Sequence, residues 1–200
     1  MATSGKEKKL DISTEEKILE SARKVFMQKG YSATRTRDIA EDAGINLALL
    51  NYYFRSKEKL FLQVMAEKLH QLFGMVLPIV NNDDLSLYEK IETLVDKYID
   101  LLVDNPDLTI FVLNEIKVNP DNFKETVHIQ EILKDSSLIR QLKDKRPDVD
   151  PVQILSSMLG MLIFPFIAKP ILFPEMFDFK RFMKDRKILI TKWIKALIES

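Results

Sequence analysis

A short stretch after position 46 carries small apolar, amide and phenol side chains at helical spacing. Asn46 is a favourable N-cap, so a helix over Leu47 to Phe54 is predicted. Leu50 and Phe54, four residues apart, would face a core, which turns the other side of this helix outward. That outward side carries Leu47, Ala48, Asn51 and Tyr52. This outward face is therefore free to contact a partner molecule.

Two further helices are expected just before this one. Ser13 begins a capping box in front of a helix over about Thr14 to Lys29, and Gly30 ends that helix. A short helix over Thr36 to Ala43 ends at Gly44, which supplies a left-handed turn. Two short helices joined in this way make a helix-turn-helix, whose second helix enters the major groove of DNA.

Apolar periodicity and proline spacing divide the remainder of the chain. A long helix follows Ser56 as far as Pro78, and the next runs from Leu87 to Asn105-Pro106. Breaks at 119–120, 147 and 170–174 separate the later helices, because proline is poorly tolerated inside a helix. The prediction is an all-α fold of about nine helices. Its parts are a flexible tail over 1–11, a helix-turn-helix domain over 12–72 and a ligand-binding and dimerisation domain over 73–200.

Composition excludes several classes of function. The 200 residues include no Cys, which removes disulfide scaffolds, thiolate zinc sites and cysteine nucleophiles. Five Gly and the lack of a phosphate-binding glycine motif disfavour a nucleotide-binding enzyme. His70 and His128 lie far apart in the sequence, so we expect no metal site. No catalytic constellation and no cofactor are expected, and the interpretation as an enzyme has no support.

The formal net charge of zero conceals three unlike segments. Residues 1–61 hold 12 basic and 9 acidic side chains, residues 62–177 hold 11 and 18, and residues 178–200 hold 7 and 3. The first segment is therefore modestly basic, and dimerisation would double its attraction for phosphate. The acidic middle segment mildly disfavours a strongly anionic effector.

Three ordered runs of residues resemble one family. They are I-L-E-S-A-x-x-x-F-x-x-K-G-Y-x-A-T, then R-D-I-A-E-D-A-G-I-N, then L-x-Y-Y-F-x-S-K-E-K-L, and the likeness covers about Ile12 to Gln71. This segment resembles the tetracycline-repressor (TetR) family of bacterial transcriptional regulators. The resemblance implies a homodimer with a DNA-binding head and a divergent C-terminal domain that binds a small effector.

The resemblance also implies where DNA lies. Arg37 matches a position at the start of the second helix, where its guanidinium suits phosphate or guanine O6 and N7. Leu47 departs from the family, which often has a polar residue there; with Ala48 it would contact thymine methyl groups. Asn51 stands where Tyr is common, and a phosphate contact, adenine recognition and a bond within the head all stay open. Tyr53 would donate its hydroxyl to phosphate or pack.

Arg35 stands where a capping Ser or Thr is common, so it would gain a phosphate contact and lose part of a capping box with Asp38. Lys57 matches a phosphate-binding position of the family. Lys6, Lys8 and Lys9 form either a solvated tail or a flexible DNA-contacting arm. The residues expected to contact DNA are Arg35, Thr36, Arg37, Asn46, Leu47, Ala48, Leu49, Asn51, Tyr52, Tyr53 and Lys57.

The later helices are expected to pair two copies of the chain. The run from Met158 to Phe164 is apolar around most of a helix and needs burial on several sides. Helices near 151–168 and 179–198 would therefore build a homodimer, and its two-fold symmetry predicts a palindromic operator. The run from Ile154 to Ala168 spans about 15 residues, short of the roughly 20 that cross a bilayer. We accordingly expect a cytoplasmic protein.

The expected effector is a largely apolar small molecule. Polar or aromatic residues on otherwise apolar helices would orient it, and the candidates are His70, Tyr98, Phe111 and Asn114. Ligand binding would favour the arrangement of heads that does not fit DNA, which describes a repressor released by its effector. The alternative is a helix-turn-helix regulator controlled by a protein partner, or an activator.

Overall fold

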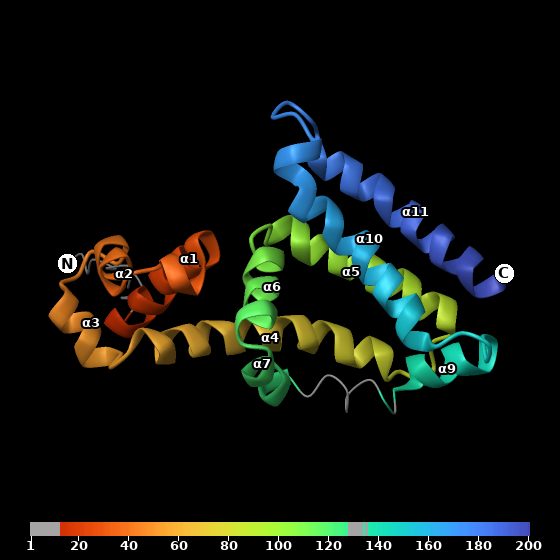
Figure 1. Cartoon of the computed structure of the whole chain (residues 1–200), viewed down its shortest axis with the longest axis horizontal. Helices are drawn as coiled ribbons and strands as arrows, with labels where there is room; N and C mark the ends of the chain where they lie inside the picture. The colour runs from red at the N-terminus through yellow and green to blue at the C-terminus, as the bar shows by residue number, and fades with distance from the viewer. Residues whose placement is uncertain (1–12, 128–133, 135) are drawn as a thin grey trace, which may run out of the picture. The chain divides into compact units, whose positions relative to one another are not determined.

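The computed structural model describes residues 13–127, 134 and 136–200, and these residues form helices and connections only (Figure 1). The expected all-α class is confirmed. The ten helices of the described ranges are α1 (Thr14–Ala33), α2 (Thr36–Asp42), α3 (Leu47–Tyr53), α4 (Lys57–Val80), α5 (Leu87–Asp104), α6 (Leu108–Val118), α7 (Pro120–Val127), α9 (Ser137–Lys145), α10 (Pro151–Leu172) and α11 (Phe179–Glu199).

The chain divides into two compact units, Met1–Ala66 and Glu67–Ser200. The division falls inside α4, so this one helix contributes to both units. The sequence placed the boundary a few residues later, between 72 and 73. The tail over 1–11, with Lys6, Lys8 and Lys9, and the side chain of His128 lie outside the described residues.

The N-terminal unit is a small core enclosed by α1, α2, α3 and the start of α4. Ser13 caps α1 by accepting a hydrogen bond from the Glu16 N–H at 3.2 Å. Gly30 has a φ of 72° and a ψ of 172° and interrupts the regular helix as predicted, but α1 continues beyond it to Ala33 and does not end there. Fully buried residues from three helices meet inside: Ile18, Ala22, Phe26, Ile39 and Leu50.

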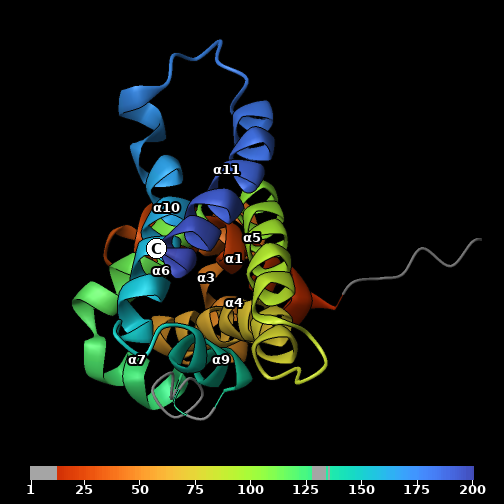
Figure 2. The same cartoon turned by 90° about the vertical axis from the view of Figure 1, so that its right-hand side faces the viewer.

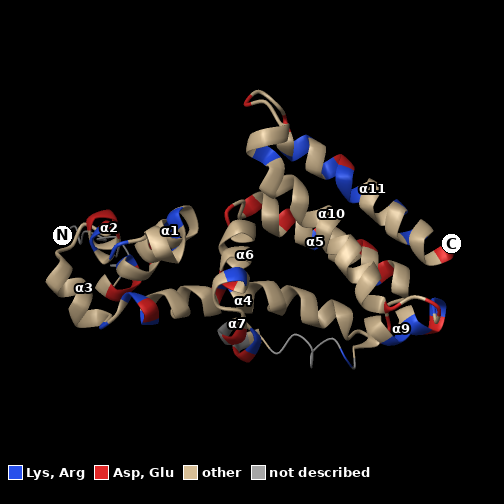
Figure 3. Cartoon of the chain, in the orientation of Figure 1, with Lys and Arg blue, Asp and Glu red and all other residues tan. Residues whose placement is uncertain are grey.

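In the C-terminal unit, α5, α10 and α11 lie side by side (Figures 1 and 2). Lysines of α11 pair with acids of α5, and Figure 3 shows these basic and acidic residues along the two helices. The Lys187 ammonium lies 2.7 Å from the Asp96 carboxylate and 2.6 Å from that of Asp100. Burial lowers the pKa of Lys187, but the hydrogen bonds to these two carboxylates outweigh this effect and raise it, so the ammonium stays charged.

Lys90 joins α5 to α9 from inside the unit. Its side chain is fully buried, and its ammonium donates to Leu85 O at 3.0 Å, Ser137 Oγ at 2.6 Å and Gln141 Oε1 at 2.8 Å. Burial lowers the pKa of this amine. All three acceptors are neutral, so the three N–H groups of the ammonium are satisfied without a contacting counter-charge.

Two prolines do not end their helices where the sequence places the breaks. Pro78 lies inside α4, which continues to Val80, and Pro170 lies inside α10, which continues to Leu172. Both lie in a final turn, where a proline costs one backbone hydrogen bond and the helix is about to end in any case. As a result α10, with 22 residues, is longer than the apolar run expected over 154–168, and its length and composition would suffice to cross a membrane. Helices in the cores of folded proteins share this length and composition.

Candidate functional site

The turn between α2 and α3 has the geometry of a glycine-terminated helix. Gly44 adopts a φ of 67°, its N–H donates to Glu41 O at 3.1 Å, and the Ile45 N–H donates to Ala40 O at 3.0 Å. These two bonds form a Schellman motif, which satisfies carbonyls at the end of α2. The motif sets the direction in which the chain enters α3. The structure thus confirms the left-handed turn that Gly44 predicts.

Helix α3 presents one face to the core and the other to solvent. Asn46 caps it by accepting from the Leu49 N–H at 2.8 Å, while Leu50 and Phe54 are buried. Tyr52 is 80% exposed and Tyr53 is 40% exposed, and their rings meet edge to face with centroids 5.4 Å apart. Of the other residues expected to meet DNA, Ala48 and Asn51 are exposed and Leu47 and Leu49 are half-buried.

The start of α2 carries half of a capping box. The Asp38 carboxylate accepts from the Arg35 N–H at 3.2 Å, but a guanidinium has no acceptor with which to return the bond. Asp38 also accepts from the Lys29 ammonium at 3.0 Å. The bonds from Lys29 and from the Arg35 N–H lower the pKa of Asp38. Beside them, Thr36 is half-buried and Arg37 is exposed.

Lys57 connects two helices of the N-terminal unit, a role that the sequence did not indicate. Its ammonium donates to Tyr31 O at 2.9 Å and Thr34 O at 3.0 Å, and it lies 4.1 Å from the centre of the Tyr31 ring. It therefore fastens the first turn of α4 to the end of α1. An ammonium has three donors, so one N–H remains for a phosphate.

Arg55 is a basic residue of this surface that is not among those predicted from the sequence. It lies in the connection between α3 and α4 and is exposed, and within the described ranges its guanidinium has no hydrogen-bonding or ionic partner. Its position in the sequence, between Tyr53 and Lys57, could have identified it as a candidate for DNA contact. Arg35, Arg37, Arg55 and Lys57 together give the α2–α3 surface its positive charge.

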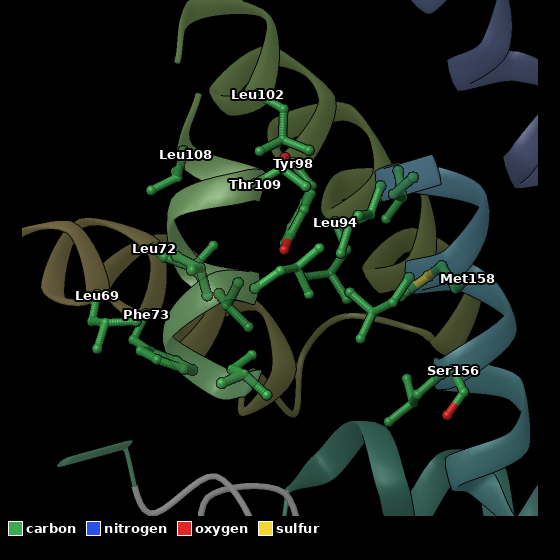
Figure 4. A pocket seen from close by; sticks show the side chains of 18 of the residues that line it. Leu69, Leu72, Phe73, Leu94, Tyr98, Leu102, Leu108, Thr109, Ser156 and Met158 are labelled. Carbon is green, nitrogen blue, oxygen red and sulfur yellow. The ribbon is translucent and has the colours of Figure 1, made fainter. Parts of the chain in front are cut away.

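The C-terminal unit contains a cavity of about 490 Å³ (Figure 4). Its walls come from α4, α5, α6, α7, α9 and α10. Among the described residues of this lining, the polar side chains are Tyr98, Thr109 and Ser156, and the others are apolar. Figure 4 shows the Tyr98 hydroxyl pointing among these apolar side chains. Burial raises the pKa of Tyr98 to about 12, so the phenol stays protonated at neutral pH.

The four residues expected to hold an effector do not converge on this cavity. Tyr98 lines it, whereas His70, Phe111 and Asn114 are absent from its walls. His70 and Asn114 are exposed, and Phe111 is buried elsewhere in the core. Thr109, which is not among the residues predicted from the sequence, lines the cavity and is only 5% exposed. Within the described ranges no group of three or more His, Asp or Glu side chains could hold a metal ion.

Known proteins resemble this chain in two ways, through a family model that matches part of the N-terminal unit and through solved structures that share the fold. Residues 18–64 match the family model described as "Bacterial regulatory proteins, tetR family". The chain is 31% identical over 118 residues to the probable HTH-type transcriptional regulator YttP of Bacillus subtilis, covering 58% of this chain and 56% of that protein. It is 25% identical over 117 residues to the fatty acid metabolism regulator protein of the same organism, covering 58% and 59%.

The crystal structure of PfmR, a TetR family transcriptional regulator from Thermus thermophilus, superposes with a TM-score of 0.65. The superposition covers 88% of this chain and 97% of the PfmR chain. The sequence identity is 22%, so this likeness shows the fold alone. The matched segments span less than two thirds of the length of the curated relatives.

Proposed function

Because this chain belongs to the tetR family of bacterial regulatory proteins through residues 18–64, we propose that it is a repressor that a small-molecule effector releases from a palindromic operator. That it is a DNA-binding transcriptional regulator follows from the family. The repressor role, the effector and a cytoplasmic location are the parts that we propose. The observation that carries the proposal is the capped, outward-facing α3 in a basic N-terminal unit.

The DNA contacts that we propose follow from the geometry of α2 and α3. Exposed Ala48, Asn51 and Tyr52 lie on the side of α3 opposite buried Leu50, which suits the base edges of a major groove. Exposed arginines lie before and after this helix, where phosphates flank a groove. Phosphate contacts fix the position of a protein on DNA, while the base contacts select the sequence. The full proposed set is Arg35, Thr36, Arg37, Asn46, Leu47, Ala48, Leu49, Asn51, Tyr52, Tyr53, Arg55 and Lys57.

Proteins of this family act as dimers, and we propose that this chain pairs through α10 and α11, over about 151–168 and 179–198. On α11, the large apolar side chains of Leu189, Trp193 and Leu197 are exposed and recur every four residues, which aligns them in one stripe. On α10, Leu159 and Phe164 are also exposed. Contiguous apolar stripes of this kind favour burial against a second copy.

Effector control would act through α4. This helix supplies Leu60 and Val64 to the core of the N-terminal unit, and Leu72 and Val76 to the wall of the cavity. A ligand that favours one position of the cavity walls would favour one position of this helix. The ligand shifts DNA binding only by its difference in affinity for the two states.

The test begins with selection of bound fragments from the source genome, followed by binding measurements on the selected operator. Arg37→Ala should weaken binding and make the affinity less dependent on salt. Lys17→Ala is the matched control, because Lys17 is an exposed base on α1, outside the proposed surface. Equal affinities of the two variants would place DNA elsewhere. Affinity for non-palindromic fragments alone would contradict the two-fold operator.

A further inference from the structure

Among the described residues, the lining of the cavity in the C-terminal unit offers no group that could neutralise a charge. The lining residues from α4, α6, α7, α9 and α10 include no titratable side chain, and the single one from α5 is Tyr98. An ionised ligand group placed there would lose water without gaining a counter-ion. The surface of the cavity therefore discriminates by charge as well as by shape.

Thr109 is a polar residue of the cavity lining whose burial is not explained by any hydrogen bond to the described fold. Its hydroxyl is buried and has no hydrogen-bond partner among the described residues. A helical Thr usually bonds back to a carbonyl of the preceding turn, and a buried hydroxyl without a partner is destabilising. The Tyr98 hydroxyl likewise has no partner in the described part of the chain, and it points into the same space (Figure 4). The lining of this otherwise apolar cavity thus contains two hydroxyl donors, that of Thr109 buried in the wall and that of Tyr98 pointing inward.

We propose that the effector is an uncharged, mainly apolar carbonyl compound whose oxygen accepts a hydrogen bond from Thr109 and from Tyr98. This inference rests on the proposed function, since it names the chemical class of ligand for that site. Esters and thioesters of aliphatic acids fit the description, because their carbonyls accept hydrogen bonds and carry no charge. The free aliphatic acids do not fit, because they are ionised at neutral pH.

The size of the discrimination follows from the acid itself. A carboxylic acid with a pKa near 4.3 is protonated in only about one molecule in 500 at pH 7. If the cavity accepts only this neutral form, the acid binds about 500-fold more weakly than its ester. Its affinity then rises about tenfold for each unit by which the pH falls from 8 to 6, while the affinity of the ester stays constant.

The binding experiment uses decanoic acid and methyl decanoate, measured by calorimetry on the full chain between pH 6 and pH 8. We expect the ester to bind at least about 100-fold more tightly at pH 7, with the pH slopes given above. Equal affinities, a pH-independent affinity of the acid or binding of neither probe would overturn the proposal.

A hydroxyl deletion tests the role of Thr109. Thr109→Val keeps the shape and should weaken binding of the ester about tenfold, the effect of one lost hydrogen bond. The unliganded variant should melt at the same temperature as the parent or higher, because a buried group without a partner has been removed. Thr93→Val on α5, outside the cavity, is the matched control and should leave the affinity unchanged. An ester affinity unaffected by Thr109→Val would overturn the assignment of the donor.

Failure of the ligand class and failure of effector control are separable. Tight ester binding that leaves operator affinity unchanged would refute release by a ligand, while the ligand class would stand. Release of the operator by decanoic acid at low concentration and neutral pH would refute the ligand class, while control by an effector would stand.

Discussion

Replacing Lys57 by Met tests whether this residue stabilises the head or serves DNA alone. The substitution keeps the length of the side chain and removes the ammonium. Two carbonyls, of Tyr31 and Thr34, lose their donor, and the face of the Tyr31 ring loses its cation. Thr34 is buried, so water does not readily replace the lost bond to its carbonyl.

The expected loss can be estimated from these contacts. A hydrogen bond to a charged group contributes about 1.5 kcal/mol at the lower end of its range, which suits a half-buried lysine. Two such bonds and a cation–π contact of about 0.5 kcal/mol give a loss of about 3.5 kcal/mol from the free energy of unfolding of the N-terminal unit.

Hydrogen exchange read by mass spectrometry measures this loss in peptides of α1 and α2. Trp193 is the single Trp of the chain and lies on α11, so its fluorescence reports the C-terminal unit and should not change. Lys59→Met is the control, because Lys59 is exposed in the same turn of α4. Equal protection of the α1 and α2 peptides from exchange in Lys57→Met and Lys59→Met would refute a stabilising role of Lys57 and leave DNA contact as its remaining role.

The other predictions concern a turn, an ion pair and the dimer. Gly44→Ala should lower the free energy of unfolding of the N-terminal unit by about 1 kcal/mol, measured by urea unfolding followed by circular dichroism. A Cβ at this position meets no atom within 4 Å, so the cost comes from the left-handed backbone alone. Gly44→Asn should cost less, because Asn tolerates this conformation better than Ala. The pKa of Asp38 is lowered in the folded protein, so ionised Asp38 stabilises the fold above its unfolded pKa, and this contribution is lost as the pH falls through the folded pKa. Asp38→Asn should therefore flatten the acid limb of a curve of unfolding free energy against pH. Leu189→Glu should give a monomer in sedimentation at micromolar concentration, and a persistent dimer would place the interface elsewhere.

Local rules accounted for the N-terminal unit because its decisive residues act over a few positions. Ser13, Gly44 and Asn46 each cap or end a helix through bonds to neighbours within five residues, and the structure shows each of them doing so. Lys57 shows the limit of such rules. Its carbonyl partners lie 23 and 26 residues earlier in the chain, which no periodicity indicates.

The cavity could not be predicted in the same way. Six helices contribute to its walls, so membership depends on how each helix is rotated against several others. His70 and Asn114 interrupt apolar patterns, but both lie on exposed faces. Thr109 could not be identified from the sequence, because Thr is common near the start of a helix. It is unusual only because its hydroxyl is buried without a hydrogen-bond partner among the described residues, which the sequence does not show.

The buried Lys90 gives the protein a chemical reporter of its own folding. Reagents that acylate amines need an accessible, unprotonated nitrogen, and the Lys90 nitrogen is enclosed and engaged in three hydrogen bonds. It should therefore stay unlabelled while exposed lysines such as Lys180 and Lys184 react. Labelling of Lys90 would mark the molecules in which α9 has separated from α5. The rate of that single modification, with and without an effector, would measure how often the two helices part.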